Sequence, residues 1–410
     1  MSARGLEALV ADYTDRLARS LVLHAGRSVI SPRARALLGS HLVDGDLAGR
    51  PGEWGVPPIA APAAAIEDLA RSLTERLFGT PHIELRALTG SLANGLAVAS
   101  VTKPGDAIVM PPAWAFGHKS LGAEGYPGQG ARRVIEMPWD GPAFAPDLDG
   151  LRRLLRQEPP RLVVLGLSRT LFPEPLAEVA ALAREAGARL LYDGAHVFGL
   201  IAGGAFPNPL AAGFDALTGS THKTLPGPTG GAVVCRDAAD LEALATDGDA
   251  WLSTYGNARV AALAQTFVEM VEHGGAYARR VVDNARTLAR ALAGEGFAVV
   301  GADRGFTATH QVIVDITGVG TSAEIAARLG AAMVMVNPPS RADRRLRDGR
   351  ADGLWLRVGT SAVTRVGMSA PEMTAIAGLL ARLLRDGEAP ERVAPAVEAL
   401  ATGFREVRFA

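Results

Sequence analysis

Lys223 is the side chain of this sequence whose surroundings point most directly to chemistry. It lies in Thr221–Gly231, a turn rich in glycine and proline between two apolar strand patterns, and Asp193 ends another expected strand upstream. A lysine amine forms a Schiff base with an aldehyde, and a carboxylate pairs with a protonated pyridine nitrogen. Together they predict a pyridoxal 5′-phosphate site with Lys223 and Asp193 as catalytic groups. A solvated loop lysine is the alternative for Lys223 alone.

A short polar turn offers a place for the cofactor's phosphate. It precedes the expected helix 96–101, so that backbone amides, hydroxyls and the positive end of the helix dipole form an anion site. A simple Ser or Thr N-cap explains the turn equally well. The expected phosphate contacts are Thr89, Gly90 and Ser91. Ser220 and His222, close to the lysine, are expected to touch the cofactor too, and His222 to take part in catalysis.

Further candidates follow two of the expected strands. Asp193 lies at the carboxyl end of its strand, the edge where parallel sheets bind ligands. His196, close behind it, is expected to hold Asp193 in place or touch the cofactor ring, as a catalytic or cofactor-binding group, with a core histidine as the alternative. Ser168 ends the strand 162–167 and is placed to reach the cofactor's phenolic oxygen, unless it is an ordinary loop serine.

Arg357 interrupts the otherwise apolar strand 354–358. A charge flanked in this way is costly unless it is paired. The carboxylate of an amino-acid substrate is a natural bidentate partner for a guanidinium group, and a structural ion pair is the alternative. Arg357 is therefore a predicted substrate-binding residue.

The composition fits a globular enzyme that acts on small molecules. The chain has 410 residues, of which 48% are apolar, enough for a large core and two or three domains. The 42 basic and 43 acidic residues give no basic field for nucleic acid. No apolar stretch reaches the roughly 18 residues of a membrane span, and no secretory signal is visible, so a cytoplasmic protein is expected. The histidine and cysteine spacings predict no metal site.

The order of apolar patterns predicts an α/β fold. An N-terminal arm (1–45) precedes a large domain (46–285) in which short strands alternate with helices, which indicates a mostly parallel sheet with helices on both faces. A smaller α+β domain (286–410) follows. The expected strands are 107–110, 162–167, 189–192, 216–218, 231–234, 298–300, 311–316 and 354–358, and the main helices are 1–24, 64–78, 175–185, 260–293, 323–329 and 371–384.

These motifs together resemble the serine hydroxymethyltransferase family of fold type I pyridoxal-phosphate enzymes, over nearly the whole chain. The resemblance rests on the turn Thr89-Gly90-Ser91 with Ala93-Asn94, on Asp193-Gly194-Ala195-His196, on the lysine segment 221–231 and on Arg357-Val358-Gly359-Thr360. It implies a fold type I transferase and a homodimer with active sites at the interface. It also implies that Lys223 carries the cofactor as a Schiff base and that Arg357 grips the α-carboxylate.

The sequence departs from the family in the segment 46–52. Where the family has Tyr-Ala-Glu-Gly-Tyr-Pro-Gly, this chain reads Asp-Leu-Ala-Gly-Arg-Pro-Gly, so the catalytic glutamate and the tyrosine are both absent. In the family that glutamate manages protons during folate-dependent one-carbon transfer. Trp54 and Val56 stand nearby, and Glu53 could substitute only if the loop were remodelled.

A second departure concerns the histidine that stacks on the cofactor ring in the family. An alignment anchored on Met110 places Trp114 at this position, and an indole can stack on a pyridine but transfers no proton. Trp114 is therefore a predicted cofactor contact. His118 is then the nearest candidate for a general base and a predicted substrate-binding residue, with a surface role as the alternative.

Two further segments differ from the family. Residues 253–257 replace the glycine-rich segment that closes the phosphate site from the partner subunit, which leaves Gly256 as the expected cofactor contact. Tyr255 in this segment is a predicted substrate-binding residue, with interface packing as the alternative. Thr229 stands where an arginine usually follows the second proline of the lysine loop.

The lysine, the aspartate, the phosphate turn and the carboxylate-binding arginine that the chain retains are needed in every Schiff-base reaction of an amino acid. The family's glutamate and tyrosine, which the chain lacks, take part in folate-dependent transfer. The sequence therefore predicts a folate-independent enzyme that acts through a Schiff base of a bulky, modified amino acid and breaks a bond at Cα or Cβ, as a lyase or transferase of specialised or antibiotic biosynthesis. Aldol-type cleavage or transaldol transfer, β-elimination and oxidative decarboxylation all remain open. A genuine folate-dependent hydroxymethyltransferase and a non-catalytic binding protein of the same fold are the alternatives.

Overall fold

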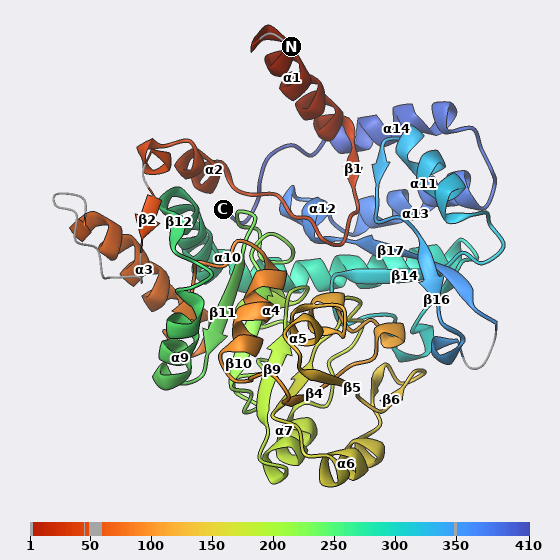
Figure 1. Cartoon of the computed structure of the whole chain (residues 1–410). Helices are drawn as coiled ribbons and strands as arrows, with labels where there is room; N and C mark the ends of the chain where they lie inside the picture. The colour runs from red at the N-terminus through yellow and green to blue at the C-terminus, as the bar shows by residue number, and fades with distance from the viewer. Residues whose placement is uncertain (1–2, 45, 49–59, 348–350) are drawn as a thin grey trace. The chain divides into compact units, whose positions relative to one another are not determined.

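The computed structural model describes residues 3–44, 46–48, 60–347 and 351–410 (Figure 1). These residues fall into two compact units. The larger unit contains the described residues between 30 and 279, together with 345–347, 409 and 410. The smaller unit contains 3–29, 280–344 and 351–408.

A seven-stranded sheet forms the centre of the larger unit. Its strands lie in the order β3-β11-β10-β9-β8-β4-β5. The pairs from β10 to β5 are parallel, whereas β11 runs antiparallel to both β10 and β3. The strands are β3 (Ile83–Glu84), β4 (Ala107–Met110), β5 (Arg133–Glu136), β8 (Leu162–Leu165), β9 (Arg189–Asp193), β10 (Ala216–Ser220) and β11 (Gly231–Cys235). The predicted, mostly parallel sheet is confirmed.

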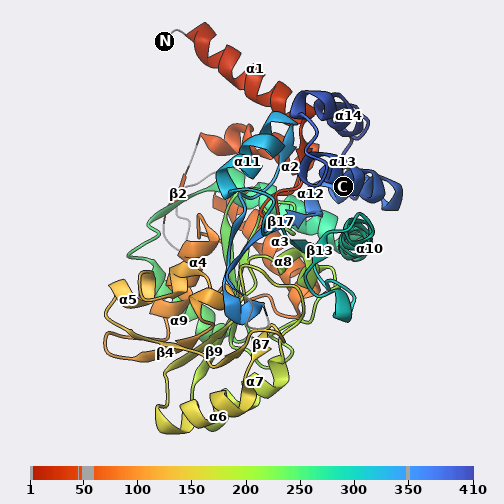
Figure 2. The same ribbon diagram turned by 90° about the vertical axis from the view of Figure 1, so that its right-hand side faces the viewer.

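The sheet is covered on both faces because its central strands are apolar on both sides. Every residue of β4, β8 and β11 is buried, the pattern of strands with no solvent-facing side. Two successive residues of β10 face the two layers. Gly219 faces helix α8 (Phe198–Ala202), because a Cβ on Gly219 would touch Phe198. Ser220 faces helix α4 (Gly90–Ala99), because a Cβ on Gly90 would touch Ser220. Figure 2 shows this layering from the side.

Helices and short strands complete the larger unit. Its other helices are α2 (Pro32–Leu38), α3 (Ala60–Phe78), α5 (Tyr126–Gln129), α6 (Leu148–Gln157), α7 (Leu176–Glu185), α9 (Ala238–Gly248) and the first part of α10 (Asn257–Gly294). Ser31 caps α2 by accepting a hydrogen bond from Ala34 N at 3.0 Å. The strand pair β6 (Trp139–Asp140) and β7 (Ala145–Pro146) is antiparallel, as is the pair β2 (Asp46–Ala48) and β12 (Thr254–Gly256).

The smaller unit is an α+β structure built on an antiparallel sheet of order β13-β14-β17-β16. Its strands are β13 (Ala298–Val299), β14 (Gln311–Asp315), β16 (Ser340–Ala342) and β17 (Gly353–Gly359). The end of α10 packs there with α1 (Ala3–Arg19), α11 (Ser322–Ala331), α12 (Ser361–Arg365), α13 (Ala370–Leu384) and α14 (Pro390–Thr402). Its core contains Leu292, Ile325, Leu356, Ile376 and Val397.

The N-terminal residues belong to this smaller unit. Strand β1 (Leu21–Val22) pairs in parallel with β15 (Val334–Met335), and α1 contacts α14 (Figure 1). The sequence analysis treated residues 1–45 as a separate arm, and it did not foresee α14. Pairing between segments three hundred residues apart leaves no local periodicity from which it could be read.

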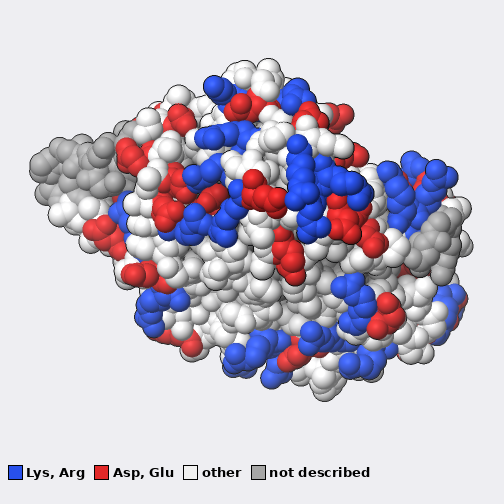
Figure 3. All heavy atoms as spheres, turned by 90° about the horizontal axis from the view of Figure 1, so that it is seen from below, with Lys and Arg blue, Asp and Glu red and all other residues white. Residues whose placement is uncertain are grey.

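The described residues were compared with the features expected of nucleic-acid-binding, membrane-spanning and metal-binding proteins. The face in Figure 3 intersperses Lys and Arg with Asp and Glu, so it carries no broad field of one sign. No helix among the described residues is long and apolar enough to cross a membrane. Within those same residues no group of three or more His, Cys, Asp or Glu side chains could hold a metal ion. The one cysteine, Cys235, ends β11 and is 1% exposed.

Candidate active site

A cavity of about 290 Å³ opens in the larger unit where β8, β9 and β10 end. Parallel sheets bind ligands at this edge because the loops that follow the strands converge there. Most of the residues singled out from the sequence line it, together with Asn94, Leu167, Ala195 and Thr229. The predicted residues in its wall are Thr89, Gly90, Ser91, His118, Ser168, Asp193, His196, Ser220, His222 and Lys223.

Asp193 is the most firmly held carboxylate of the cavity. It ends β9 and is 7% exposed. Its Oδ2 accepts a hydrogen bond from Asn94 Nδ2 at 2.9 Å, and its Oδ1 accepts one from Ala195 N at 3.1 Å. The two bonds fix the direction of the carboxylate in the cavity wall.

Asn94 joins Asp193 to two further polar groups. Its Oδ1 accepts from Thr218 Oγ1 at 2.6 Å, and its Nδ2 also donates to Ser120 Oγ at 3.1 Å. The sequence analysis quoted Asn94 in the phosphate turn but assigned it no contact with Asp193. The available signal was an amide in the otherwise apolar stretch 92–98, because a buried amide needs partners.

The loop that carries Lys223 is closed at its base by Thr221. Thr221 Oγ1 donates to Pro228 O at 2.6 Å, Thr221 N donates to Gly230 O at 3.1 Å, and Gly227 N donates to Thr221 O at 2.9 Å. On the adjoining turn, Thr224 Oγ1 donates to His196 O at 2.9 Å. These bonds fix the loop at both sides of Lys223, so the lysine stands on a rigid base.

The phosphate turn begins α4. Thr89 is the N-cap, and its side chain accepts from Leu92 N at 3.0 Å. The turn lies so close to β10 that a Cβ on Gly90 would come within 2.4 Å of Ser220 Oγ. The N-terminal amides of α4 and the hydroxyls of Ser91 and Ser220 therefore converge on one wall of the cavity, as an anion site requires.

His118 also lines the cavity. Its Nδ1 accepts from Ser120 N at 3.3 Å and lies 2.8 Å from Ser120 Oγ. Burial lowers the pKa of His118; the charge of Asp193 opposes this shift, whereas Lys223 and Lys119 add to it. A neutral imidazole with Nδ1 as acceptor carries its proton on Nε2, so it can donate a hydrogen bond through Nε2 as it stands. It can act as a base only after its ring rearranges.

Comparison with known proteins identifies the family. The family model for serine hydroxymethyltransferase matches residues 2–380. The chain belongs to the serine hydroxymethyltransferase family. It is 39% identical to the serine hydroxymethyltransferase of Aeropyrum pernix over 84% of this chain and 78% of that protein. It is 35% identical to the enzyme of Pyrobaculum islandicum over 98% of this chain and 93% of that protein.

A solved structure of another activity has a similar fold. The L-threonine transaldolase from Pseudomonas fluorescens, in its internal aldimine state, matches with a TM-score of 0.89 and 28% identity, over 99% of this chain and 93% of that one. The protein is therefore a fold type I, pyridoxal-phosphate-dependent enzyme of the hydroxymethyltransferase family, as the sequence predicted.

The cavity suits pyridoxal phosphate by its own chemistry. It offers a lysine amine, a carboxylate held by two donors and an anion site at the start of a helix, the three features that the aldehyde, the ring nitrogen and the phosphate of this cofactor require. Lys223, Asp193 and the turn Thr89–Ser91 are the residues that would hold these three groups, and their roles stay predictions.

The predicted contact of Trp114 with the cofactor stays a prediction. Trp114 lies on a short 3₁₀ helix (Ala113–Ala115) and is absent from the cavity wall, and its ring faces the guanidinium of Arg345 at 4.1 Å. His118 occupies the wall instead. The chain bends between the two residues because Phe116 adopts a left-handed conformation, with φ of 73°. An alignment by spacing from Met110 could not register this bend.

Ser168 both lines the cavity and holds this bend. Its backbone N and its Oγ each donate to Phe116 O at 3.0 Å. The guanidinium of Arg169 covers the Phe116 ring, with its central carbon 4.3 Å from the ring centroid. The segment that carries His118 is therefore fastened to the end of β8. The predicted contact of Ser168 with the cofactor's phenolic oxygen stays a prediction.

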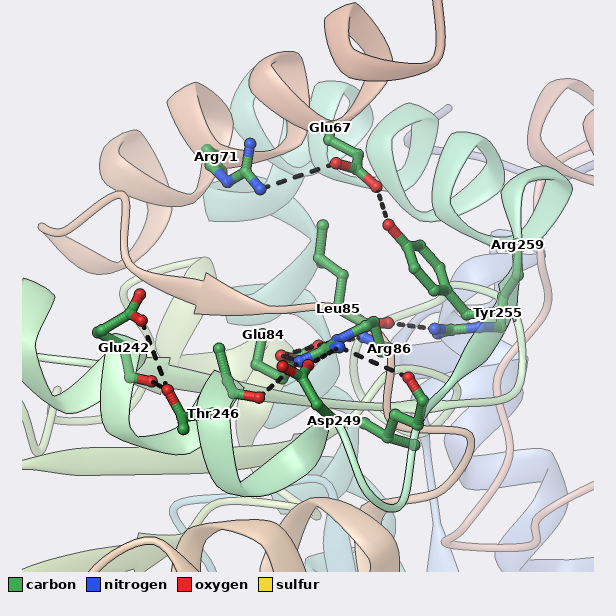
Figure 4. A network of polar contacts seen from close by, with 12 residues as sticks. Glu67, Arg71, Glu84, Leu85, Arg86, Glu242, Thr246, Asp249, Tyr255 and Arg259 are labelled. Atoms are coloured by element: carbon green, nitrogen blue, oxygen red, sulfur yellow. Dashed lines mark hydrogen bonds and ion pairs between the residues drawn. The ribbon is translucent and has the colours of Figure 1, made fainter. Parts of the chain in front are cut away.

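Tyr255 and Gly256 are not among the residues that line this cavity. Tyr255 lies on β12, is buried, and donates a hydrogen bond from its Oη to Glu67 Oε1 of α3 (Figure 4). This contact favours packing over substrate binding within one chain. Their expected roles across a dimer interface stay predictions.

The remaining predicted residues lie in different parts of the chain. His196 lines the cavity and is buried. Arg357 lies in the middle of β17 in the smaller unit, opposite Ile313 of β14, and its role as carboxylate ligand stays a prediction. Glu53, Trp54 and Val56 lie outside the described residues.

Proposed function

We propose that this family member is a folate-independent enzyme that breaks and forms the Cα–Cβ bond of a β-hydroxy-α-amino acid, in the manner of a transaldolase. The observation that carries the proposal is the replacement of the family's tyrosine and glutamate in the segment 46–52. The similarity to an L-threonine transaldolase over 99% of the chain supports it. The β-elimination and oxidative decarboxylation considered from the sequence are the competing outcomes of the assay.

The bound cofactor supplies an electron sink for the negative charge that develops at Cα. In the proposed reaction a base takes the proton of the substrate's β-hydroxyl, the Cα–Cβ bond breaks, its electron pair stays at Cα, and an aldehyde leaves. A second aldehyde then accepts the same electron pair, and its oxygen takes the proton back from the base, so that no oxidant or reductant is consumed. Asp193 would hold the protonated ring nitrogen of the cofactor, and Lys223 would hold its aldehyde carbon.

We propose that His118 takes the hydroxyl proton, which requires its ring to rearrange so that an unprotonated nitrogen faces the substrate. Its imidazole is kept neutral by burial, which lowers its pKa, and it lies in the cavity wall with Asp193 and Lys223. The missing glutamate leaves no other family base in this role. A bulky second aldehyde, and hence a substrate of specialised or antibiotic biosynthesis, fits a pocket that has lost the family's tyrosines.

The test is an exchange assay without folate. Purified protein is incubated with L-threonine and an aromatic aldehyde, and the release of acetaldehyde and the new aromatic β-hydroxy amino acid are measured. We expect both products in equal amounts, with no effect of tetrahydrofolate. Carbon dioxide, ammonia or hydrogen peroxide in place of the exchange product would contradict the proposal and would indicate decarboxylation, elimination or oxidation.

A genuine hydroxymethyltransferase is the second candidate, because the Aeropyrum pernix enzyme is 39% identical to this chain. This candidate predicts serine-to-glycine conversion that requires tetrahydrofolate. It also predicts a strong red-shifted visible absorption band with glycine that appears only when tetrahydrofolate is added. An unchanged spectrum on adding folate would exclude it.

We further propose a homodimer and a carboxylate-binding role for Arg357. Helix α1 presents Leu6, Leu9, Val10 and Tyr13, each more than half exposed, and an apolar stripe of this kind is typical of an interface. Light scattering of the purified protein checks the dimer. Arg357→Ala should raise KM for substrates with a free α-carboxylate and leave the corresponding amides unaffected; equal losses for both would indicate a structural arginine.

A further inference from the structure

Ser120 is a buried hydroxyl group that the roles proposed above do not use. It lies on the short 3₁₀ helix Lys119–Leu121, of which His118 is the N-cap. Its Oγ lies 2.8 Å from His118 Nδ1 and accepts a hydrogen bond from Asn94 Nδ2 at 3.1 Å. Its backbone N donates to the same Nδ1 at 3.3 Å. Ser120 therefore joins the imidazole of His118 to the polar groups that hold Asp193.

The orientation of the Asn94 amide follows from its partners. Its Nδ2 donates to Asp193 Oδ2 at 2.9 Å, because a carboxylate oxygen accepts. Its Oδ1 accepts from Thr218 Oγ1 at 2.6 Å. The second hydrogen of Nδ2 is then the one that reaches Ser120 Oγ. All three contacts agree on one orientation of the amide, so Asn94 acts on Ser120 as a donor.

The hydroxyl hydrogen of Ser120 needs an acceptor of its own. Among the described residues, Asn94 Nδ2 and His118 Nδ1 are the hydrogen-bond partners of Ser120 Oγ, and Asn94 is a donor. Ser120 and Asn94 are both buried, so water is a poor substitute. His118 Nδ1 therefore receives the hydroxyl as well as the backbone N–H of Ser120, and the neutral ring carries its proton on Nε2.

Two kinds of interaction bear on the protonation of His118. Burial lowers its pKa, the charge of Asp193 opposes this shift, and Lys223 and Lys119 add to it. The contacts with Ser120 act at one nitrogen alone. A proton on Nδ1 would face the backbone N–H of Ser120 and would turn the hydroxyl hydrogen away from its acceptor, at the cost of an unsatisfied buried donor. Ser120 therefore disfavours the ring forms in which Nδ1 is a donor.

We propose that Ser120 is a positioning residue, which keeps Nδ1 of His118 unprotonated and leaves Nε2–H as the donor that meets a ligand in the cavity. His118 Nε2 makes no hydrogen bond among the described residues, and His118 lines the cavity. A neutral imidazole that donates in this way polarises a carbonyl, and the oxygen of an aldehyde is the acceptor that the proposed exchange brings to the site. For this choice of ligand the inference rests on the proposed function.

The test observes the two ring nitrogens of His118 directly. Full-length protein with its cofactor is prepared with isotopically labelled histidine, its imidazole nitrogens are followed by NMR, and His118→Gln serves to assign the His118 signals. At a pH above the pKa of His118 we expect a proton on Nε2 and a hydrogen-bonded, unprotonated Nδ1. A neutral ring with its proton on Nδ1 would overturn the proposal. This measurement needs no substitution of Ser120, so it does not depend on whether a variant folds.

Ser120→Ala removes the hydroxyl and keeps the backbone N–H. The acid dissociation constant of His118, read from the same signals as pH is varied, should fall about three- to tenfold, because the neutral ring loses a donor. Ser120→Thr keeps a hydroxyl and should stay within about twofold of the wild-type value. The matched control is Ser100→Ala, which removes a hydroxyl that donates to Ala97 O at 3.1 Å at the end of α4. An unchanged constant in Ser120→Ala, or an equal change in Ser100→Ala, would overturn the proposal.

The role of Ser120 and the proposed function fail in different experiments. The state of the imidazole is measured without substrate, so it does not depend on which bond of the substrate breaks. If His118 carries its proton on Nε2 but no aldehyde exchange occurs, the proposed function is wrong and the role of Ser120 stands. If exchange occurs but the neutral ring carries its proton on Nδ1, the role of Ser120 is wrong and the proposed function stands.

Discussion

The two faces of strand β9 hold buried carboxylates in opposite ways. On the cavity face, Asp193 receives hydrogen bonds from Asn94 and from the backbone of Ala195. On the other face, Tyr192 donates to Glu174 Oε2 at 2.8 Å, and Glu174 Oε1 is buried without a partner among the described residues. Burial raises the pKa of Glu174 to about 7, and the bond from Tyr192 only partly opposes it.

The two carboxylates differ in what holds them. Asp193 accepts bonds from Asn94 and Ala195, and Asn94 is itself held by Thr218, so the direction of this carboxylate in the cavity wall is fixed. Glu174 is bound by Tyr192, whose ring meets the Phe214 ring edge-on. We therefore expect catalysis on the cavity face and a structural role for the Glu174–Tyr192 pair.

The largest effect is expected when Lys223, which lines the same cavity as Asp193, is replaced. Lys223→Ala should lower turnover by about 10³-fold or more, because no other described amine lines the cavity to bind the cofactor's aldehyde. Steady-state assays and the loss of the bound cofactor's visible absorption band measure this. Substantial activity in the variant would show that another group carries the cofactor.

Removal of the carboxylate itself should come next. Asp193→Ala should lower turnover by about 10²-fold or more and also weaken cofactor binding, since the ring nitrogen loses its counter-charge. Cofactor affinity and kcat are measured together. If the variant behaves as the wild type in both, the pairing of Asp193 with the ring is wrong.

Among the residues that hold Asp193, the one that bonds it directly should affect turnover more than the one that acts through it. Asn94→Ala removes one of its two donors and should lower kcat about 10-fold, whereas Thr218→Val removes only the support of Asn94 and should lower it about threefold. A larger loss in Thr218→Val than in Asn94→Ala would contradict this order.

Substitution of Glu174, on the other face of β9, should have the smallest effect on activity. It should have the largest effect on how the unfolding free energy depends on pH. The pKa of Glu174 lies above its unfolded value of 4.5, so the folded state binds the extra proton and stability falls as pH rises from about 4.5 to 7. Glu174→Gln removes this dependence. Its unfolding free energy relative to the wild type should therefore increase by up to about 3 kcal/mol between pH 4.5 and pH 8.

Denaturant unfolding at both pH values measures this difference, and kcat serves as the control because it should stay close to the wild-type value. Tyr192→Phe is the complementary variant. It removes the hydrogen bond that Tyr192 donates to Glu174 Oε2 and should extend to higher pH the range over which stability falls. An unchanged slope in Glu174→Gln would mean that the carboxyl titrates near its ordinary pKa in the folded protein.

Much of the fold could be predicted because the larger unit is locally consistent. The strands expected at 107–110, 189–192 and 231–234 are found at Ala107–Met110, Arg189–Asp193 and Gly231–Cys235, since buried parallel strands read as short apolar runs. Helix α10, expected at 260–293, spans Asn257–Gly294. What failed depended on distant contacts, as with the pairing of β1 and β15.

The site was predictable where a residue ends a strand and unpredictable where the backbone bends. Asp193, Ser168 and Lys223 follow strands whose ends were visible in the sequence, and all three line the cavity. The spacing from Met110 could not show that the left-handed Phe116 bends the chain between Trp114 and His118. Asn94 was missed as the partner of Asp193 because their contact joins a helix to a strand about a hundred positions apart.

The reactivity of the Cys235 thiol can report local unfolding at one edge of the seven-stranded sheet. Burial raises the pKa of its thiol far above the ordinary range, and only a thiolate reacts quickly with alkylating reagents. The residue lies at the end of β11, between β3 and β10. The rate at which a thiol reagent modifies the native protein therefore measures how often this edge of the sheet detaches, without any label being introduced.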